Sequence, residues 1–324
     1  MNKFTKILIA SLLGFATIGG KAIAETPYPE KPITFVVPFA AGSATDKLAR
    51  VLALEASKTW GQSIVVENKG GASGFIASQA VARAAPDGYT IFVTSNTTHA
   101  SNSALFKNLP YDPVKDFAPV SKLGTIPMAL VVNPKSIPVE TVPEFIQYLK
   151  DNPDKVFFGS GSTSARISGE LLKIIGDVKI SNADYKSNPQ AVMDLVGGQI
   201  QMMIADAATT LPLAKEGKLK ALAVSTKTRS EVAPELPTLH ESGLEGYEMV
   251  AWFASYVPAG TPTEIVDKIN KEFVRILDNP EVKKNFLTMG IVAESSSPEA
   301  LSAFQAEETA KWKDIVAKAG IEIQ

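Results

Sequence analysis

The sequence predicts an α/β protein of two lobes, and three observations lead to this class. Short apolar runs of strand length alternate with longer helical patterns over most of the 324 residues, which is the rhythm of βαβ units. The length exceeds that of one typical domain of about 100–200 residues. The composition, with 45% hydrophobic and 20% charged positions, is that of a folded globular chain.

The first 24 residues have the pattern of an export signal. Lys3 and Lys6 form a positively charged start, residues 7–20 are an apolar run of 14 positions, and Ala22 and Ala24 are the small residues that a signal peptidase needs. This run is shorter than the about 20 residues that cross a bilayer. We therefore expect cleavage after Ala24 and a chain exported into a periplasm.

The mature chain begins with a predicted βαβαβ series. Strands are expected at 33–37, 64–66 and 90–94, with helices at about 45–60 and 74–84 between them. This order predicts parallel strands joined by right-handed crossovers. A second series begins near Met128, and its expected elements are a strand at 129–132, a helix at 142–150, a strand at 156–158, a helix at 165–175, and further alternation through 192–195, 200–204, 211–215 and 219–224.

The last part of the chain returns to the first lobe in this interpretation. A strand is expected at 250–257, and the spacing of Ile265, Ile269, Phe273 and Ile276 predicts a helix with one apolar face. A final helix carries Phe304, Trp312, Ile315 and Val316. Residues 127–225 would form one lobe, and residues 25–126 and 226–324 the other. Two crossings, near 124–128 and 223–228, would make a two-strand hinge.

Composition excludes several classes of function. The chain has 32 basic and 34 acidic residues, and removal of three lysines with the signal leaves a net charge of −5, so nucleic acid is not an expected partner. The cysteine count is zero, which removes disulfides, thiolate catalysis and cysteine-bound metals. His99 and His240 are the only histidines, too few for a histidine metal site. We expect no metal and no cofactor.

Two loops combine a strand end, small residues and the start of a helix. They are residues 38–46 and 159–164, and residues 70–74 form a third glycine-rich turn. The first turn of a helix leaves N–H groups without internal partners, and these groups with the helix dipole bind carboxylate or phosphate. The alternative is that each loop is an ordinary turn with a Ser or Thr cap. In two facing lobes, the loops fit the crevice where α/β sheets bind ligands.

In this order the motifs resemble the Bug family, the extracytoplasmic solute-binding receptors of tripartite tricarboxylate transporters. The resemblance covers nearly all of the mature chain, and its motifs are PFAAGSATD at 38–46, GQSIVVENKGGASG at 61–74, APDGYT at 85–90, LPYDPVKDFAPVS at 109–121, FGSGSTSARISGELL at 158–172, YKSNPQAVMDLVGGQ at 185–199, KLKALAVSTKTRS at 218–230, LPTLHESG at 236–243 and VPAGTP at 257–262. It implies a two-lobed periplasmic binding protein, a "Venus flytrap" with two parallel-rich sheets, that closes around a small carboxylate.

The resemblance also implies which residues hold the ligand. In the family, main-chain groups of the two loops hold one carboxylate. Carried over by position, these groups belong to Ala41, Gly42, Ser43 and Ala44 in the first loop, and to Ser160, Gly161, Ser162, Thr163 and Ser164 in the second. Asp46 is expected to cap and orient its loop, and Phe39 to form an apolar wall. Asn96 and Asp206 follow strands on opposite lobes and are candidates for the distal end of the ligand.

Arg166 stands about where the family often has histidine. One hypothesis is that it pairs bidentately with a second carboxylate of the ligand. The alternative is a solvated arginine on the first turn of a helix. The ligand class stays open between aromatic acids and di- or tricarboxylates.

The leading hypothesis is a monomeric periplasmic binding protein that delivers a small organic acid to membrane transporter subunits. Its mechanism would be closure around the ligand, not catalysis. A receptor that signals to a membrane kinase is one alternative. A periplasmic enzyme acting on a small acid is another, but neither histidine belongs to a recognisable Ser/His/Asp set.

Overall fold

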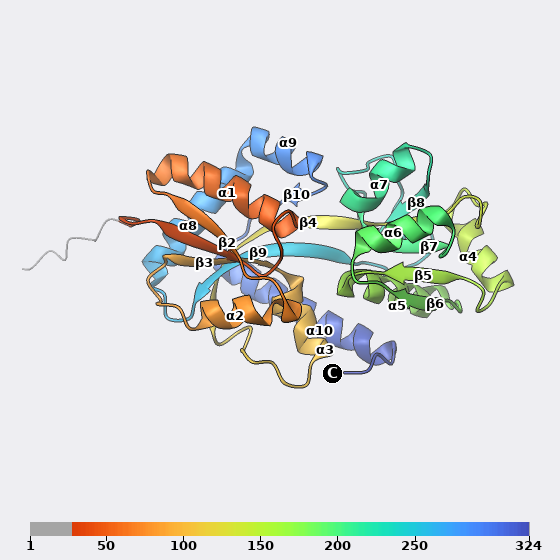
Figure 1. Cartoon of the computed structure of the whole chain (residues 1–324), viewed down its shortest axis with the longest axis horizontal. Helices are drawn as coiled ribbons and strands as arrows, with labels where there is room; N and C mark the ends of the chain where they lie inside the picture. The colour runs from red at the N-terminus through yellow and green to blue at the C-terminus, as the bar shows by residue number, and fades with distance from the viewer. Residues whose placement is uncertain (1–27, 324) are drawn as a thin grey trace, which may run out of the picture.

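The computed structural model describes residues 28–323, so the predicted export signal lies outside the described residues. Figure 1 shows two groups of elements joined by two long strands, β4 (Phe117–Val132) and β9 (Val250–Pro258). The main strand order is β2-β1-β3-β9-β4-β7-β5-β6, and β8 and β10 also pair with β4. Helices lie against the sheet in both groups (Figure 1), which confirms the predicted α/β class.

The first group contains the start and the end of the described chain. Its strands are β1 (Ile33–Val37), β2 (Ile64–Asn68), β3 (Thr90–Ser95) and the short β10 (Val292–Ala293). Its helices are α1 (Ala44–Trp60), α2 (Phe75–Ala82), α3 (Asn102–Leu105), α8 (Thr263–Asp278), α9 (Pro280–Thr288) and α10 (Pro298–Lys318), with the helical turns η1 (Ala72–Gly74) and η2 (Thr97–Ser101).

The second group is built from the middle of the chain. Its strands are β5 (Phe157–Ser160), β6 (Ser181–Asp184), β7 (Met202–Asp206) and β8 (Lys220–Val224). Its helices are α4 (Val142–Asp151), α5 (Thr163–Gly176), α6 (Asn188–Gly197) and α7 (Ala207–Lys215). The segment between β8 and β9 also contacts this group, because the Tyr247 hydroxyl donates a hydrogen bond to the Ser168 carbonyl at 2.7 Å.

Parallel pairing is confined to the outer strands, so the expected parallel-rich sheets are in fact mixed. Strand β1 runs parallel to β2 and β3, and β5 runs parallel to β6 and β7. Strands β4 and β9 pair antiparallel, from Phe117 opposite Pro258 to Pro127 opposite Val250. The reason is topological: the chain leaves the first group along β4 and returns along β9, so the two strands run in opposite directions.

Local sequence explains why the helices next to the loops begin where they do. Ser43 caps α1, with its Oγ accepting from the Asp46 N–H at 3.2 Å. Ser162 caps α5 in the same way, accepting from the Ala165 N–H at 3.2 Å. A side-chain oxygen at this position satisfies one of the donors that the first helical turn leaves open. Both caps therefore fix the direction in which a loop meets its helix.

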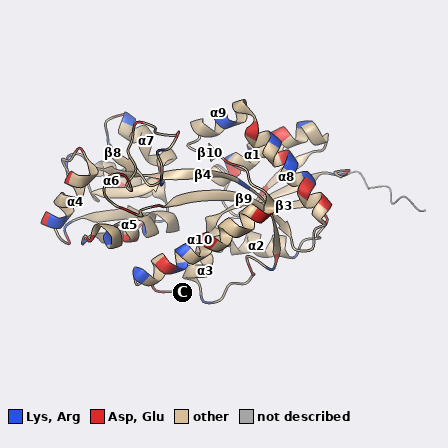
Figure 2. Cartoon of the chain, turned by 180° about the vertical axis from the view of Figure 1, so that it is seen from behind, with Lys and Arg blue, Asp and Glu red and all other residues tan. Residues whose placement is uncertain are grey.

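Helix α10 crosses from the first group toward the second. It contacts β4, α3 and α5, and its Glu308 carboxylate accepts from the Trp252 indole N–H of β9 at 3.1 Å, both side chains being buried. Basic and acidic residues alternate along its outer face (Figure 2). Beyond α10, Ile321 and Glu322 reach the cavity described below. Among residues 28–323, no helix has the length and apolar character needed to cross a membrane.

Candidate functional site

The first loop, between β1 and α1, is organised around Asp46. This residue is 2% exposed. Its carboxylate accepts hydrogen bonds from the Gly42 N–H at 2.8 Å, from Arg50 Nε at 3.0 Å and from Asn68 Nδ2 at 3.0 Å. Burial raises the pKa of the Asp46 carboxyl, but the bonds from Arg50, Gly42 and Asn68 lower it by more, so the pKa lies below its ordinary value. Asp46 holds the loop in place from within.

The second loop, between β5 and α5, is held by Asn188. The Asn188 Oδ1 accepts from the Gly161 N–H at 3.0 Å, and its Nδ2 donates to Ser162 Oγ and to Asp206 Oδ2, both at 3.2 Å. Burial raises the pKa of the Asp206 carboxyl, and the bond from Asn188 opposes this shift. Asn188 therefore ties the loop to the carboxyl end of β7.

The third turn, residues 70–74, includes backbone conformations that few residues other than glycine adopt. Ser73 has φ 53° and lies between Gly71 at φ 111° and Gly74 at φ 84°. The Asn102 side chain donates to the Ser73 carbonyl at 3.0 Å. A non-glycine residue held in the left-handed region is uncommon and is often found where backbone or side chain faces a ligand.

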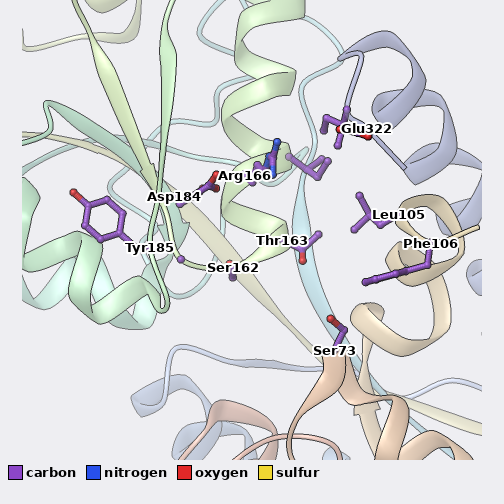
Figure 3. Close-up of a pocket in the computed structure, with 13 residues that line it drawn as sticks. Ser73, Leu105, Phe106, Ser162, Thr163, Arg166, Asp184, Tyr185 and Glu322 are labelled. Atoms are coloured by element: carbon purple, nitrogen blue, oxygen red, sulfur yellow. The ribbon is translucent and has the colours of Figure 1, made fainter. Parts of the chain in front are cut away.

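A cavity of about 270 Å³ brings the second loop and the third turn together. Figure 3 shows α5 on one side and α3 with the end of the chain on the other, with Ser73 below. The lining comprises Ser73, Leu105, Phe106, Ser160, Gly161, Ser162, Thr163, Arg166, Ile167, Asp184, Tyr185, Ile321 and Glu322. Both groups of elements thus contribute to one partly open cavity.

The predicted site residues fall into two sets. Ser160, Gly161, Ser162, Thr163 and Arg166 line the cavity. Outside its lining are Phe39, Ala41, Gly42, Ser43, Ala44, Asp46, Asn96, Ser164 and Asp206. Two of these, Asn96 and Ser164, nevertheless come together from the two groups, since Asn96 Nδ2 donates to Ser164 Oγ at 3.4 Å.

Most residues of the cavity wall opposite the second loop could not be predicted from the sequence. Leu105, Phe106, Ile321 and Glu322 carry no motif of their own. Of this wall only the turn at 70–74, which includes Ser73, had a recognisable signal, namely its glycines beside a helix start.

Arg166 is the one basic residue of the cavity lining. Its Nε is buried and has no hydrogen-bond partner. Arg50, Arg229 and Arg275 each pair with an acidic side chain, whereas among residues 28–323 no ion pair includes Arg166. A buried guanidinium nitrogen without a partner is costly. Because Nε is covered and the side chain as a whole is only half-buried, an anion in the cavity would meet the rest of the guanidinium.

The geometry offers little to acid–base or metal chemistry. Burial lowers the pKa of His99 to about 3, and its ring stacks on Tyr256 with the centroids 3.7 Å apart, so it is uncharged near neutral pH and packed in the interior. Within residues 28–323, no three His, Cys, Asp or Glu side chains converge on a point that would hold a metal ion.

Comparison with known proteins gives a consistent result. Residues 48–321 match the family described as "Tripartite tricarboxylate transporter family receptor". The chain is 32% identical to protein BugT of Bordetella pertussis over 324 residues, covering 99% of both chains. A structure of an R. palustris protein with adipate has a TM-score of 0.81 at 34% identity, covering 91% of this chain and 99% of that one. MatC from Rhodopseudomonas palustris with bound malate gives 0.75 at 35% identity, covering 89% and 100%.

Proposed function

The chain belongs to the receptor family of tripartite tricarboxylate transporters. From this premise we propose that it captures a small organic carboxylate in the cavity. It would then present this ligand to the membrane subunits of such a transporter. The observation that carries the proposal is the Arg166 side chain, which lines a cavity walled by both groups of elements and has no ion-pair partner among residues 28–323. The adipate and malate bound by two similar proteins support a carboxylate as ligand.

The start of α5 supplies the donors for a carboxylate. The N–H groups of Ala165 and Arg166 already donate to Ser162, so Thr163, which lines the cavity, is the position of the first turn whose N–H group is expected to meet an anion. The positive end of the helix dipole and the Arg166 guanidinium act in the same direction. The first loop, with Phe39 and residues 41–44 held by Asp46, would meet the ligand from the facing lobe when the cleft closes.

Closure, rather than catalysis, would be the functional step. We retain as a proposal the lobes at 25–126 with 226–324 and at 127–225, hinged where β4 and β9 cross. Tyr247, which this division places in the first lobe, donates to Ser168 of the second, so within this proposal we move the second boundary from residue 225 to about Met249. A ligand that contacts both lobes binds the closed form better than the open form and shifts the population accordingly. Export to the periplasm with cleavage after Ala24, and action as a monomer, belong to the same proposal.

A thermal-shift screen tests the proposal. The mature chain, from Glu25 on, is unfolded, dialysed and refolded to remove any ligand that copurifies, and is then heated with mono-, di-, tri- and aromatic carboxylates. At a hundredfold excess over its dissociation constant a ligand adds about 2.7 kcal/mol of stability, which raises the Tm by several degrees. We expect a selective shift, with the acid recovered unchanged. No shift with any acid of the panel would overturn the proposal.

A further inference from the structure

The acidic and basic residues around the cavity differ in number and in exposure to solvent. One basic side chain, Arg166, lines it together with two acidic ones, Asp184 and Glu322. Arg166 is half-buried and its Nε is fully covered, whereas both acidic residues are exposed. The lining therefore has a formal charge of −1, with its positive charge on the inside and its negative charges toward solvent.

Each acidic residue is fixed to a different side of the cavity. Asp184 ends β6, and its Oδ1 accepts from Ser160 Oγ at 3.2 Å and from Asn182 Nδ2 at 2.7 Å. Glu322 follows α10, which Glu308 anchors to the β9 indole of Trp252. Among residues 28–323, neither Asp184 nor Glu322 takes part in an ion pair. Nothing in the cavity lining neutralises them except Arg166.

Much of the remaining lining is apolar. Leu105, Phe106, Ile167 and Ile321 lie there beside the polar residues Ser73 and Tyr185, and the Phe106 ring packs edge-on against Phe75 with the centroids 4.9 Å apart. A second carboxylate against these four apolar side chains would lose hydration without gaining a donor. At the mouth it would meet Asp184 and Glu322, charges of its own sign.

We propose that the cavity selects a monocarboxylate, with its single carboxylate toward Arg166 and the start of α5, and with an uncharged or cationic far end beside Asp184 and Glu322. This inference rests on the proposed function and names the substrate class within it. It assigns to Glu322, at the end of the chain, the role of a residue that determines specificity by repelling a second negative charge.

Isosteric ligand pairs test the inference. Succinate, adipate and terephthalate are each compared with their monoamides, in which a carboxamide of the same shape replaces one carboxylate. Dissociation constants are measured by calorimetry with the refolded mature chain. A like charge about 4 Å away costs about 1 kcal/mol in water, equivalent to about fivefold in affinity. We expect each monoamide that binds to bind at least about fivefold more tightly than its diacid. Benzoate or hexanoate binding in the absence of any response to the diacids would support the same conclusion.

Variants of Glu322 and Asp184 identify which of the two residues repels a second carboxylate of the ligand. In Glu322→Gln and in Asp184→Asn the ratio between the affinities of monoamide and diacid should fall by up to about fivefold, because each variant removes one exposed charge. Added salt should reduce the ratio in the native chain for the same reason. Glu245→Gln serves as the control, since Glu245 is exposed and lies outside the cavity lining, and should leave the ratio unchanged.

Two outcomes would overturn the inference, and they are distinguishable. If a diacid binds as tightly as its monoamide or more tightly, the selectivity is wrong while the receptor function stands. If no carboxylate of the larger panel binds at all, the proposed function fails and the inference fails with it.

Discussion

A Cβ atom on Gly161 would lie 1.9 Å from the carbonyl carbon of Ser187. The second loop of the cavity thus runs against the start of α6 with no room for a side chain between the two backbones. The Gly161 N–H donates to Asn188 Oδ1 at 3.0 Å within the same contact. The position of the loop depends on a glycine at this place because the neighbour is backbone, which cannot move aside without displacing α6.

This contact predicts that Gly161→Ala weakens the binding of the ligand. The loop and α6 must separate, so we expect a loss of stability of about 2 kcal/mol, within the range found for overpacked sites, and at least tenfold weaker carboxylate binding. The matched control is Gly197→Ala, because a Cβ on Gly197 meets nothing within 4 Å and alanine favours a helix by up to about 1 kcal/mol. Urea unfolding and calorimetry measure both effects. Native-like affinity in Gly161→Ala would refute the role of this contact.

Arg166→Gln removes the charge and keeps much of the side-chain length. We expect every carboxylate that binds the native chain to bind about tenfold more weakly, since a hydrogen bond to a charged group contributes about 1.5–3 kcal/mol. The Tm of the ligand-free protein should stay the same or rise, because Arg166 Nε has no internal partner to lose. Arg229→Gln is the control, as Arg229 pairs with Glu241 on the surface. Equal affinities in Arg166→Gln and the native chain would mean that Arg166 is a solvated arginine that does not bind the ligand.

The sequence predicts one side of the cavity better than the other, for a physical reason. Residues 160–164 and Arg166 follow a strand pattern and begin a helical one, so their place at the carboxyl end of β5 follows from local periodicity. Ile321 and Glu322 face Arg166 across the same cavity, more than 150 positions further along the chain. They arrive there because α10 lies along β4 and α3, a long-range packing relation that no local pattern encodes.

Strand β4 illustrates a different difficulty. The sequence predicts a strand at 129–132, whereas the structure has one strand from Phe117 to Val132. Pro119, Gly124 and Pro127 interrupt the first part of this run, and proline in a strand ordinarily indicates an edge or a break. The pairing with β9 accommodates them through two register shifts, between Pro119 and Ser121 and between Lys122 and Gly124. Such bulges are invisible in the sequence.

Asp46→Asn tests whether this carboxylate organises the first loop. The amide would place a donor against the donors of Gly42, Arg50 and Asn68, so we expect a loss of about 1–3 kcal/mol at pH 7. Because the folded-state pKa of Asp46 is lowered, its contribution is complete above the unfolded value of about 4 and disappears as the pH falls through the folded value. The native chain should therefore lose more stability than Asp46→Asn below pH 4.

The control for this series is Asp267→Asn, because Asp267 is exposed on α8. Denaturant unfolding of the three proteins at pH 7, 5, 4 and 3 measures the difference. If the free energy of unfolding falls equally steeply with decreasing pH in Asp46→Asn and in the native chain, Asp46 does not hold the loop through its charge.

His99 predicts a second pH dependence, at higher pH. Its ring is fully buried, Nδ1 is 2.8 Å from Thr98 Oγ1, and burial lowers its pKa to about 3. The unfolded chain, with a histidine pKa of about 6.5, binds a proton that the folded chain rejects. Stability from this group is therefore complete above about pH 6.5 and falls by at most about 1.4 kcal/mol per pH unit as the pH decreases toward 3.

We expect urea midpoints of the native chain to decrease between pH 6.5 and 4.5. His99→Gln should be less stable at pH 7 but should show a shallower decrease. His240→Gln retains His99 and should keep that part of the slope. If His99→Gln and the native chain lose stability in parallel, the proton uptake comes from other groups.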